Sequence, residues 1–379
     1  MKVKLLKFVC SIFVCGILVS NVQAVDVEGV EIVKLDVPSF SEAQVVNKKL
    51  GMKVMTHITV RAKVHYYKGE PIIVVDNYGY GGNKWTYAPG SVELAYEQMK
   101  KGCQLIRKSM IPHEEKVTVL GGGVDGIMLA NRLAKEGFKV TVYAEQFSPN
   151  TLSDIKIGVF LPFLNEEDKK DKIKTRLEEL SYRTYADWFE LKGEKNKSIR
   201  PIDLYIVDES GKVNLPRKSE IIPNPSIINL EIGFKESFAA LKYKSFAIDT
   251  GRIMTDMMEE GRRLGVNFVK MNVDSVDRFM ANGSGIIFNC IGLELKEKEE
   301  REEMSLISHT MCIEGGKGME YAIYVKHENG NYTCLFPGKD NAVNVTGTFF
   351  EMLEKNASEA DNVKRLVSRA NQTFKRNSE

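Results

Sequence analysis

Three glycines in the first half of the chain have the spacing that binds the diphosphate of a nucleotide. Gly121, Gly123 and Gly126 follow a short apolar run at 117–120, and a helical pattern begins at Val124. In this arrangement the first glycine allows a tight turn, the second leaves room for a diphosphate, and the third lets the helix lie close to the strand. We therefore expect a bound dinucleotide here. The alternative is a turn that uses glycine only for its backbone freedom.

The elements around these glycines form a strand–helix–strand unit. Apolar residues spaced three and four apart predict the helix, Gly137 ends it, and 139–143 has the character of a second strand. Glu145 follows about 20 residues after Gly126, where a carboxylate can accept hydrogen bonds from a ribose. The order of strand, helix, strand and acid favours the dinucleotide over the simple turn.

A second glycine-rich stretch, 77–86, lies earlier in the chain. It follows two strand-like segments, 53–67 and 71–75. We expect a helix to begin after Pro89-Gly90-Ser91 and to end at Gly102. The amide groups at the start of that helix would favour an anion or an electron-rich carbonyl. The simpler alternative is an ordinary strand–loop–helix connection.

Length and composition bound the function classes. A chain of 379 residues, 43% of them hydrophobic, can bury a large core, and its length suggests two domains. The net charge of +2 gives no electrostatic footprint for DNA or RNA, so we expect no nucleic-acid partner.

Residues 1–24 have the pattern of a secretory signal peptide. Lys2, Lys4 and Lys7 precede an apolar run at 8–19 that is too short to span a bilayer, and 22–24 matches a cleavage site. We expect cleavage after Ala24, export to a periplasm or out of the cell, and no stable membrane insertion afterwards. The alternative is an uncleaved anchor.

Cysteines and histidines give no sign of a metal centre. The histidines are scattered and no C-x-x-C is present, so we expect no metal. Export would permit disulfides, but the sequence cannot choose a pairing. The cysteines beyond the signal segment are Cys103, Cys290, Cys312 and Cys334. Six sequons would be open in a eukaryotic host, at Asn196, Asn282, Asn331, Asn344, Asn356 and Asn371.

The second half of the chain predicts further regular elements. A charged amphipathic helix is expected at 165–191, and strand–helix–strand at 244–269 with Asp249 as the cap and Gly265 at the end of the helix. Strands recur from 305 to 350, and a polar helix and tail follow. The methionines of the helix after Asp249, expected in the core, are Met254, Met257 and Met258.

Several of these segments resemble the D-amino-acid oxidase family. The likeness is carried by 142–162, by Asn289-Cys290-Ile291-Gly292, which resembles the family's N-C-T-G, and by 77–86, which resembles its N-Y-G-H-G-G loop. It covers most of 52–350, thinly between 165 and 240. In the family the glycine-rich loop and its helix close the chain, whereas here they precede the nucleotide motif. The resemblance thus implies a circular permutation, and the alternative is a coincidental glycine loop before an unrelated cradle.

The family likeness implies an α/β fold with two parts. One is a Rossmann-like FAD-binding domain with a parallel sheet, and the other is a β-rich α+β substrate domain. The expected FAD-binding domain is 25–165, made of the permuted segment 52–110 and the unit 116–163, and it is completed by 244–295. The substrate domain is 200–243 and 305–350, followed by a C-terminal helix and tail at 351–379.

The same resemblance implies a reaction and the residues for it. FAD would take a hydride from the Cα of a D-amino acid, water would hydrolyse the imine to a 2-oxo acid and ammonia, and oxygen would be reduced to hydrogen peroxide. A homodimer is possible. Arg61 would pair with the substrate carboxylate. The other residues implied at the reaction centre are Tyr324, Tyr332 and Gly82. The residues implied to bind the cofactor are Gly81, Asn83, Trp85, Thr86, Gly121, Gly123, Val124, Gly126, Glu145, Gln146, Thr151, Ser153 and Gly158.

Departures from the family pattern keep two other functions open. Cys334 stands where a substrate-contacting tyrosine is usual, although Tyr332 faces the same side of a strand. Lys156 and Ile157 replace two small residues beside the flavin, Tyr80 replaces the loop histidine, and the sequence around Arg61 differs at Thr59, Ala62 and Val64. One alternative is therefore a flavin- or nucleotide-binding protein without turnover. Another is a nicotinamide-dependent dehydrogenase, which would leave 77–86 unexplained.

Overall fold

The computed structural model describes most of the chain. The expected signal segment, Gly81, Gly82 and Lys156 lie outside the described residues. Within the described part, no helix is long and apolar enough to cross a membrane. The described residues are 29–38, 40–42, 45–54, 58–80, 83–109, 111–154, 157–162, 172–192, 198–216, 218–232, 237–291, 305–314, 319–338, 342–348 and 359–374.

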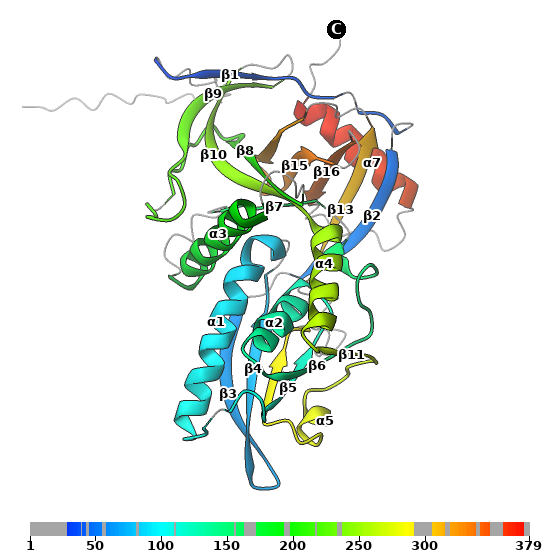
Figure 1. The fold of residues 1–379 in the computed structure, drawn as a ribbon. Helices are drawn as coiled ribbons and strands as arrows, with labels where there is room; N and C mark the ends of the chain where they lie inside the picture. The colour runs from blue at the N-terminus through cyan, green and yellow to red at the C-terminus, as the bar shows by residue number, and fades with distance from the viewer. Residues whose placement is uncertain are drawn as a thin grey trace, which may run out of the picture.

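A six-stranded, mainly parallel sheet forms the smaller unit (Figure 1). Only its edge strand β3 runs antiparallel, against β4. Strand β12 lies between β4 and β5, although it is far from both in the sequence. In spatial order the strands are β11 (Asn267–Lys270), β6 (Lys139–Ala144), β5 (Lys116–Leu120), β12 (Ile286–Asn289), β4 (Glu70–Tyr78) and β3 (Thr59–Tyr67).

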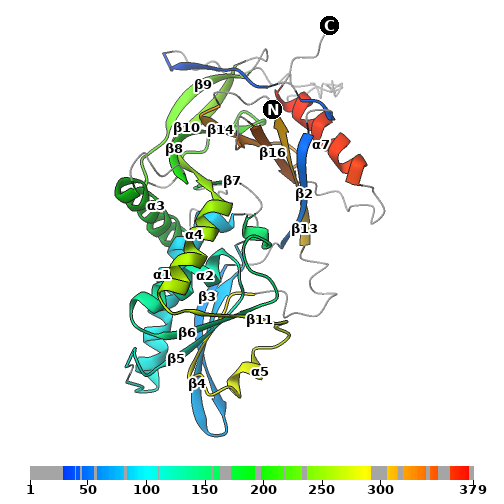
Figure 2. The same ribbon diagram turned by 45° about the vertical axis from the view of Figure 1, so that its right-hand side comes forward.

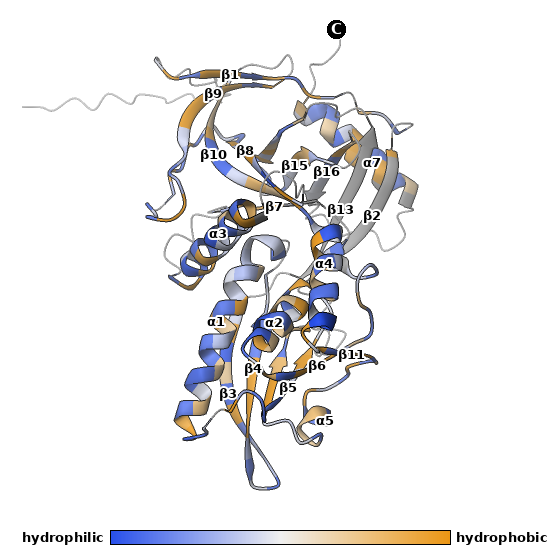
Figure 3. Ribbon diagram, in the orientation of Figure 1, coloured by the Kyte–Doolittle hydropathy of each residue, from blue (hydrophilic) through white to orange (hydrophobic). Residues whose placement is uncertain are grey.

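The side chains of this sheet are apolar on both faces, as a covered parallel sheet requires. Figure 3 shows the strands largely in the hydrophobic colour. Three helices share one apolar core with alternate residues of the strands: α1 (Lys84–Leu105), α2 (Val124–Lys135) and α4 (Thr250–Arg263). On the other face the residues Ile72, Val74 and Ile287 pack with α5 (Asp277–Met280).

A ten-stranded sheet forms the larger unit, which lies above the smaller one in Figures 1 and 2. Helix α7 (Glu359–Phe374) packs on one face, where Leu366, Ala370 and Phe374 are buried. In spatial order the strands are β1 (Ile32–Leu35), β9 (Ser226–Ile232), β10 (Phe238–Asp249), β8 (Ile199–Asp208), β14 (Tyr321–Lys326), β15 (Tyr332–Pro337), β16 (Ala342–Thr348), β13 (Ser305–Glu314) and β2 (Val45–Val54), with β7 (Ile157–Val159) paired to β10. The fold class expected from the sequence, a Rossmann-like α/β unit with a β-rich unit, is confirmed.

The ends of two helices match the sequence patterns. Gly137 follows α2 with φ +91°, and Gly265 follows α4 with φ +83°, so both use the left-handed conformation that glycine allows. Asp249 caps α4, because its carboxylate accepts a hydrogen bond of 3.1 Å from the Arg252 amide. The three methionines of α4 are buried, as expected.

The start of α1 differs from the expectation. The helix begins at Lys84 and includes Pro89, instead of beginning after Ser91. A proline inside a helix leaves the carbonyl four residues earlier without its amide partner. Here the hydroxyl of Tyr185 on α3 (Lys172–Lys192) donates to that carbonyl, which belongs to Trp85. A tertiary contact therefore replaces the missing hydrogen bond, and a local pattern cannot reveal it.

Domain boundaries also differ from those expected. Strands β1 and β2, which fall within the segment 25–165 assigned to FAD binding, pair with β9 and β13 of the larger sheet. Residues 244–249 are the end of β10 and belong to the larger sheet as well. Pairing between strands more than 100 residues apart has no local signature, so composition and periodicity could not place these edges.

Replacement of Gly90 by alanine should loosen the packing of α1 on α3. A Cβ at Gly90 would lie 2.1 Å from the carbonyl oxygen of Leu177, so the two helices would have to move apart. We expect Gly90→Ala to lower the free energy of unfolding by about 1–3 kcal/mol in urea titrations. Gly251→Ala is the matched control, because the nearest atom to its Cβ would lie at 3.5 Å. Equal stability of the two variants would contradict this account.

Candidate functional site

Three loops leave the smaller sheet at the same edge. Leu120 at the end of β5 lies opposite Asn289 at the end of β12, and Asn289 lies opposite Asp76 near the end of β4. Because these strands are parallel, the segments that follow them meet at the carboxyl edge, where ligands bind in open α/β sheets. The glycine motif at 121–126 and the loop after Tyr78 are therefore neighbours.

Each motif glycine has a separate structural role. Gly121 has φ +117°, in the left-handed region. A Cβ on Gly126 would lie 2.0 Å from the carbonyl oxygen of Gly121, so this glycine allows α2 to lie against the turn. A Cβ on Gly123 would meet only side-chain atoms, with Ser153 Oγ at 3.3 Å. Gly123 therefore leaves space in front of the first turn of α2.

The segment at 148–154 closes one side of this space. The amide of Val124 donates a 3.0 Å hydrogen bond to Ser153 Oγ. Asp154 fixes the segment, since its carboxylate accepts from the amide of Thr151 at 3.0 Å and from the hydroxyls of Thr151 and Ser148. Ser153, predicted from the family likeness, thus lies beside the glycine motif, and Thr151, also predicted, orders the segment that carries it.

The start of α1 contacts the same segment and the larger sheet. Trp85 Nε1 donates to the carbonyl of Ser153 at 3.3 Å, and Thr86 Oγ1 accepts from the amide of Leu161 at 3.0 Å. A Cβ on Gly158 would lie 3.0 Å from Trp85 Cγ. The structure therefore brings Trp85, Thr86, Ser153 and Gly158 together, and the backbone of Asn83 begins α1 beside them.

Glu145 and Gln146 lie exposed after the carboxyl end of β6. A groove of about 610 Å³ begins here and is lined by 146–151 and by Lys270 at the end of β11. Its size lies within the range of ligand clefts. The carboxylate of Glu145, this groove and the N-terminus of α2 therefore all lie along the carboxyl edge of the smaller sheet.

Sequence reasoning missed an ion pair inside this site. Lys84 Nζ lies 3.3 Å from Asp125 Oδ2, and the side chain of Asp125 is 2% exposed. Burial raises the pKa of Asp125, while the ammonium of Lys84 opposes that rise. The sequence did contain one signal of this pair, because Asp125 is an acid at the second position of the helix that follows the glycine motif. Its partner on α1 was visible only in three dimensions.

Arg61 lies at the same edge, on β3. It is exposed, and its Nε lies 4.0 Å from Oδ2 of the buried Asp76. Lys63 Nζ lies 2.8 Å from the same oxygen, and Asn289 donates to the other oxygen at 3.1 Å. Two cations thus face one carboxylate, a pairing that the sequence analysis did not anticipate.

Tyr324 and Tyr332 stack on one face of the larger sheet, with ring centroids 5.1 Å apart. Tyr324 is buried among apolar residues that include Val159, the neighbour of Gly158. Burial raises the pKa of Tyr324 well above its ordinary value, so the hydroxyl stays protonated at neutral pH. The structure therefore brings the tyrosines toward Gly158.

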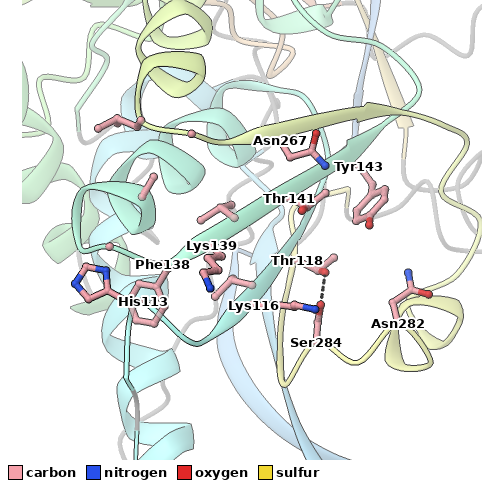
Figure 4. A pocket seen from close by; sticks show the side chains of 16 residues that line it. His113, Lys116, Thr118, Phe138, Lys139, Thr141, Tyr143, Asn267, Asn282 and Ser284 are labelled. Atoms are coloured by element: carbon pink, nitrogen blue, oxygen red, sulfur yellow. Dashed lines mark hydrogen bonds between the residues drawn. The ribbon is translucent and has the colours of Figure 1, made fainter.

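Another cavity lies at the opposite edge of the smaller sheet. Figure 4 shows it at the amino ends of β5, β6 and β11, where a hydrogen bond of 2.8 Å joins Thr118 and Ser284. Its volume is about 710 Å³, and none of the residues predicted to bind a cofactor lines it. The volume of a cavity alone therefore does not identify the candidate site.

Among the residues that the structure describes, no cluster of three or more His, Cys, Asp or Glu side chains could hold a metal ion.

Comparison with known proteins gives distant relatives. No protein-family model matches the chain. The D-amino acid oxidase of Dugesia ryukyuensis is 26% identical over 186 residues, which are 47% of this chain and 54% of that protein. The chain thus spans about half the length of this curated relative.

Three solved structures are distantly similar to this chain. Glycine oxidase from Bacillus cereus is 13% identical over 67% of this chain and 78% of that one, with a TM-score of 0.48. L-amino acid deaminase from Proteus vulgaris is 14% identical over 63% and 62%, with a TM-score of 0.42. Glycerol-3-phosphate dehydrogenase from Bacillus halodurans, complexed with FAD, is 10% identical over 69% and 54%, also at 0.42. Similarity at this level identifies neither a substrate nor a cofactor for this chain.

The different roles of Gly126 and Gly123 predict different stabilities. Gly126→Ala would push its methyl group into a backbone carbonyl, so the free energy of unfolding should fall by about 1–3 kcal/mol. Gly123→Ala would meet only Ser153 Oγ closely, and that side chain can move, so its loss should be less than about 1 kcal/mol. Urea unfolding of the two variants checks this. If Gly123→Ala destabilised the protein as much as Gly126→Ala, the space at Gly123 would not be open.

Proposed function

We propose that this protein is an FAD-dependent oxidoreductase that converts D-amino acids to 2-oxo acids, ammonia and hydrogen peroxide. The observation that carries the proposal is the meeting of two glycine-bearing loops, which follow β4 and β5, at one sheet edge. A nicotinamide cradle would require only the second of these loops.

The residues at this edge fit an FAD molecule. Gly123 leaves the room that a diphosphate needs in front of α2, and a larger residue there would fill it. Glu145 is exposed where its carboxylate would accept hydrogen bonds from the hydroxyls of a ribose, and the groove beyond Gln146 would hold the adenine end. The start of α1, at Trp85 and Thr86, would face the flavin end. When bound, FAD would supply the electron-poor ring that accepts a hydride.

Arg61 is proposed to bind the substrate carboxylate. Asp76 neutralises one of the two cations that face it, so one positive charge remains at this edge for a carboxylate. The side chain of Arg61 is 63% exposed, and its guanidinium can form two parallel hydrogen bonds with a carboxylate. This pairing would fix the orientation of the amino acid, which is the main task of the protein in such a reaction.

The stacked tyrosines are proposed to close the substrate side. Tyr324 stays protonated and can donate a hydrogen bond, while its ring excludes water. Tyr332 lies beside it and is partly exposed, so it can reach a ligand. The D-amino acid oxidase of Dugesia ryukyuensis, to which this chain is similar, supports the choice of D-amino acids.

We also infer that the chain order is a circular permutation of that family's order. The inference is supported by the pairing of β4 with β12, because this pairing puts the loop after β4 at the edge of the glycine motif although β4 comes first in the sequence. The link from Leu105 to Lys116 is short, and a 2.6 Å ion pair between Lys108 and Glu115 fixes it. Export by residues 1–24 is proposed on the sequence pattern alone.

A second candidate is a flavin-binding protein without turnover. One reason is that Asp76 already pairs with Arg61, the residue proposed to bind the substrate carboxylate. The other is that Cys334 stands where the family pattern has a substrate-contacting tyrosine. This candidate shares the cofactor and differs in the reaction, so the two can be separated experimentally.

The purified protein should be yellow, with an absorbance band near about 450 nm that is general to flavins. Under anaerobic conditions D-alanine or D-aspartate should bleach the band, and L-alanine should not. A yellow protein that no D-amino acid bleaches would support the second candidate. A colourless protein that takes up no FAD on reconstitution would overturn both.

Loss of Arg61 should weaken substrate binding without loss of FAD. We expect Arg61→Met to raise the apparent Kd for the D-amino acid about 10- to 100-fold, because a charge-assisted pair is removed. The FAD content should not change. Arg176→Met is the control for the loss of a surface arginine, since Arg176 pairs with Glu97 on the outer side of α1. Unchanged substrate affinity in Arg61→Met would refute the assignment.

A further inference from the structure

The ion pair between Lys84 and Asp125 joins the first turns of two helices. Lys84 is the first residue of α1, and Asp125 is the second residue of α2. Asp125 Oδ2 lies 3.3 Å from the ammonium, while its buried Oδ1 has no hydrogen-bond partner among the residues that the structure describes. A carboxylate this deeply buried is unfavourable without a cation, so Lys84 compensates a charge that α2 would otherwise carry alone.

The position of the ammonium indicates a second role. Lys84 Nζ lies 3.6 Å from the point that a Cβ on Gly123 would occupy. That point borders the space in front of α2, and Ser153 Oγ lies 3.3 Å from it. The side chain of Lys84 is 43% exposed, so the ion pair with Asp125 does not bury it completely.

The charges at this helix end require such a cation if a diphosphate binds. Asp125 lies in the first turn of α2, where its negative charge would repel phosphate oxygens. An ammonium has three N–H donors, and Asp125 can accept from one while two remain for phosphate oxygens. If Lys84 only compensated the charge of Asp125, its ammonium could do so equally well from a position away from Gly123.

We propose that Lys84 binds the diphosphate of a dinucleotide at the N-terminus of α2, and that Asp125 positions the lysine for this contact. The inference rests on the proposed function for the identity of the dinucleotide as FAD. It adds a ligand residue from the first turn of α1, which is not part of the glycine motif itself. The start of α1 and the glycine motif would then bind the same phosphates.

The test is binding of ADP and of FAD to the full chain by isothermal titration calorimetry. We expect Lys84→Gln to weaken both affinities about 10- to 100-fold, the loss of one charge-assisted hydrogen bond with phosphate. Lys84→Arg keeps the positive charge and should retain affinity within about 5-fold. Lys101→Gln, an exposed lysine near the other end of α1, is the matched control and should bind as the wild type does.

A double variant separates binding from folding. Lys84→Gln leaves Asp125 uncompensated, which would both destabilise the fold and repel phosphate. Lys84→Gln with Asp125→Asn removes both charges, so it should bind ADP more tightly than Lys84→Gln but more weakly than the wild type. Affinity of the double variant equal to or above that of the wild type would overturn the role of Lys84.

The outcomes distinguish this inference from the proposed function. If wild type and Lys84→Gln bind FAD equally, the inference fails and the proposed function stands. If the wild type binds ADP through Lys84 but does not bind FAD, the proposed function fails and the inference stands for another dinucleotide. If the wild type binds neither, both fail.

Discussion

The candidate site depends on the parallel pairing of β12 with both β4 and β5. Four residues of β12 set the register of the strands on each side, so the loops that follow Tyr78 and Leu120 begin at the same edge of the sheet. The carboxyl ends of parallel strands point the same way, and a strand between two others fixes the distance between their loops. Loss of this pairing would separate the two glycine-rich segments, whatever their sequences.

Electrostatics at this edge follow a repeated arrangement. Two buried carboxylates, Asp76 and Asp125, each face a lysine from a neighbouring element. Burial makes an isolated carboxylate unfavourable, so each acid holds its cation near the sheet edge. Both lysines are partly exposed, and together with Arg61 they leave positive charge on the side from which anions would approach. Such a surface suits a diphosphate and an amino-acid carboxylate.

Helix α1 connects this edge of the smaller sheet to α3 and to the larger sheet. Tyr185 of α3 donates to the carbonyl of Trp85, and Gly90 allows α3 to approach α1 closely. Trp85 in turn lies against Gly158 of β7, which pairs with β10 of the larger sheet. The irregular start of α1, with its internal proline, is thereby held in place by contacts from a different part of the chain. The position of the tyrosine pair relative to the glycine motif depends on these contacts.

The sequence by itself determined the local elements and the chemistry that they could perform. The glycine spacing at 121–126, the cap at Asp249 and the acid at Glu145 are signals within a few turns of chain, and the elements around them form as expected because such signals act locally. Tertiary structure alone decided three features: the start of α1 at Lys84, the ion pair of Lys84 with Asp125, and the membership of β1 and β2 in the larger sheet. Each depends on contacts between segments far apart in the sequence, and no propensity or periodicity records which distant segment will supply the partner.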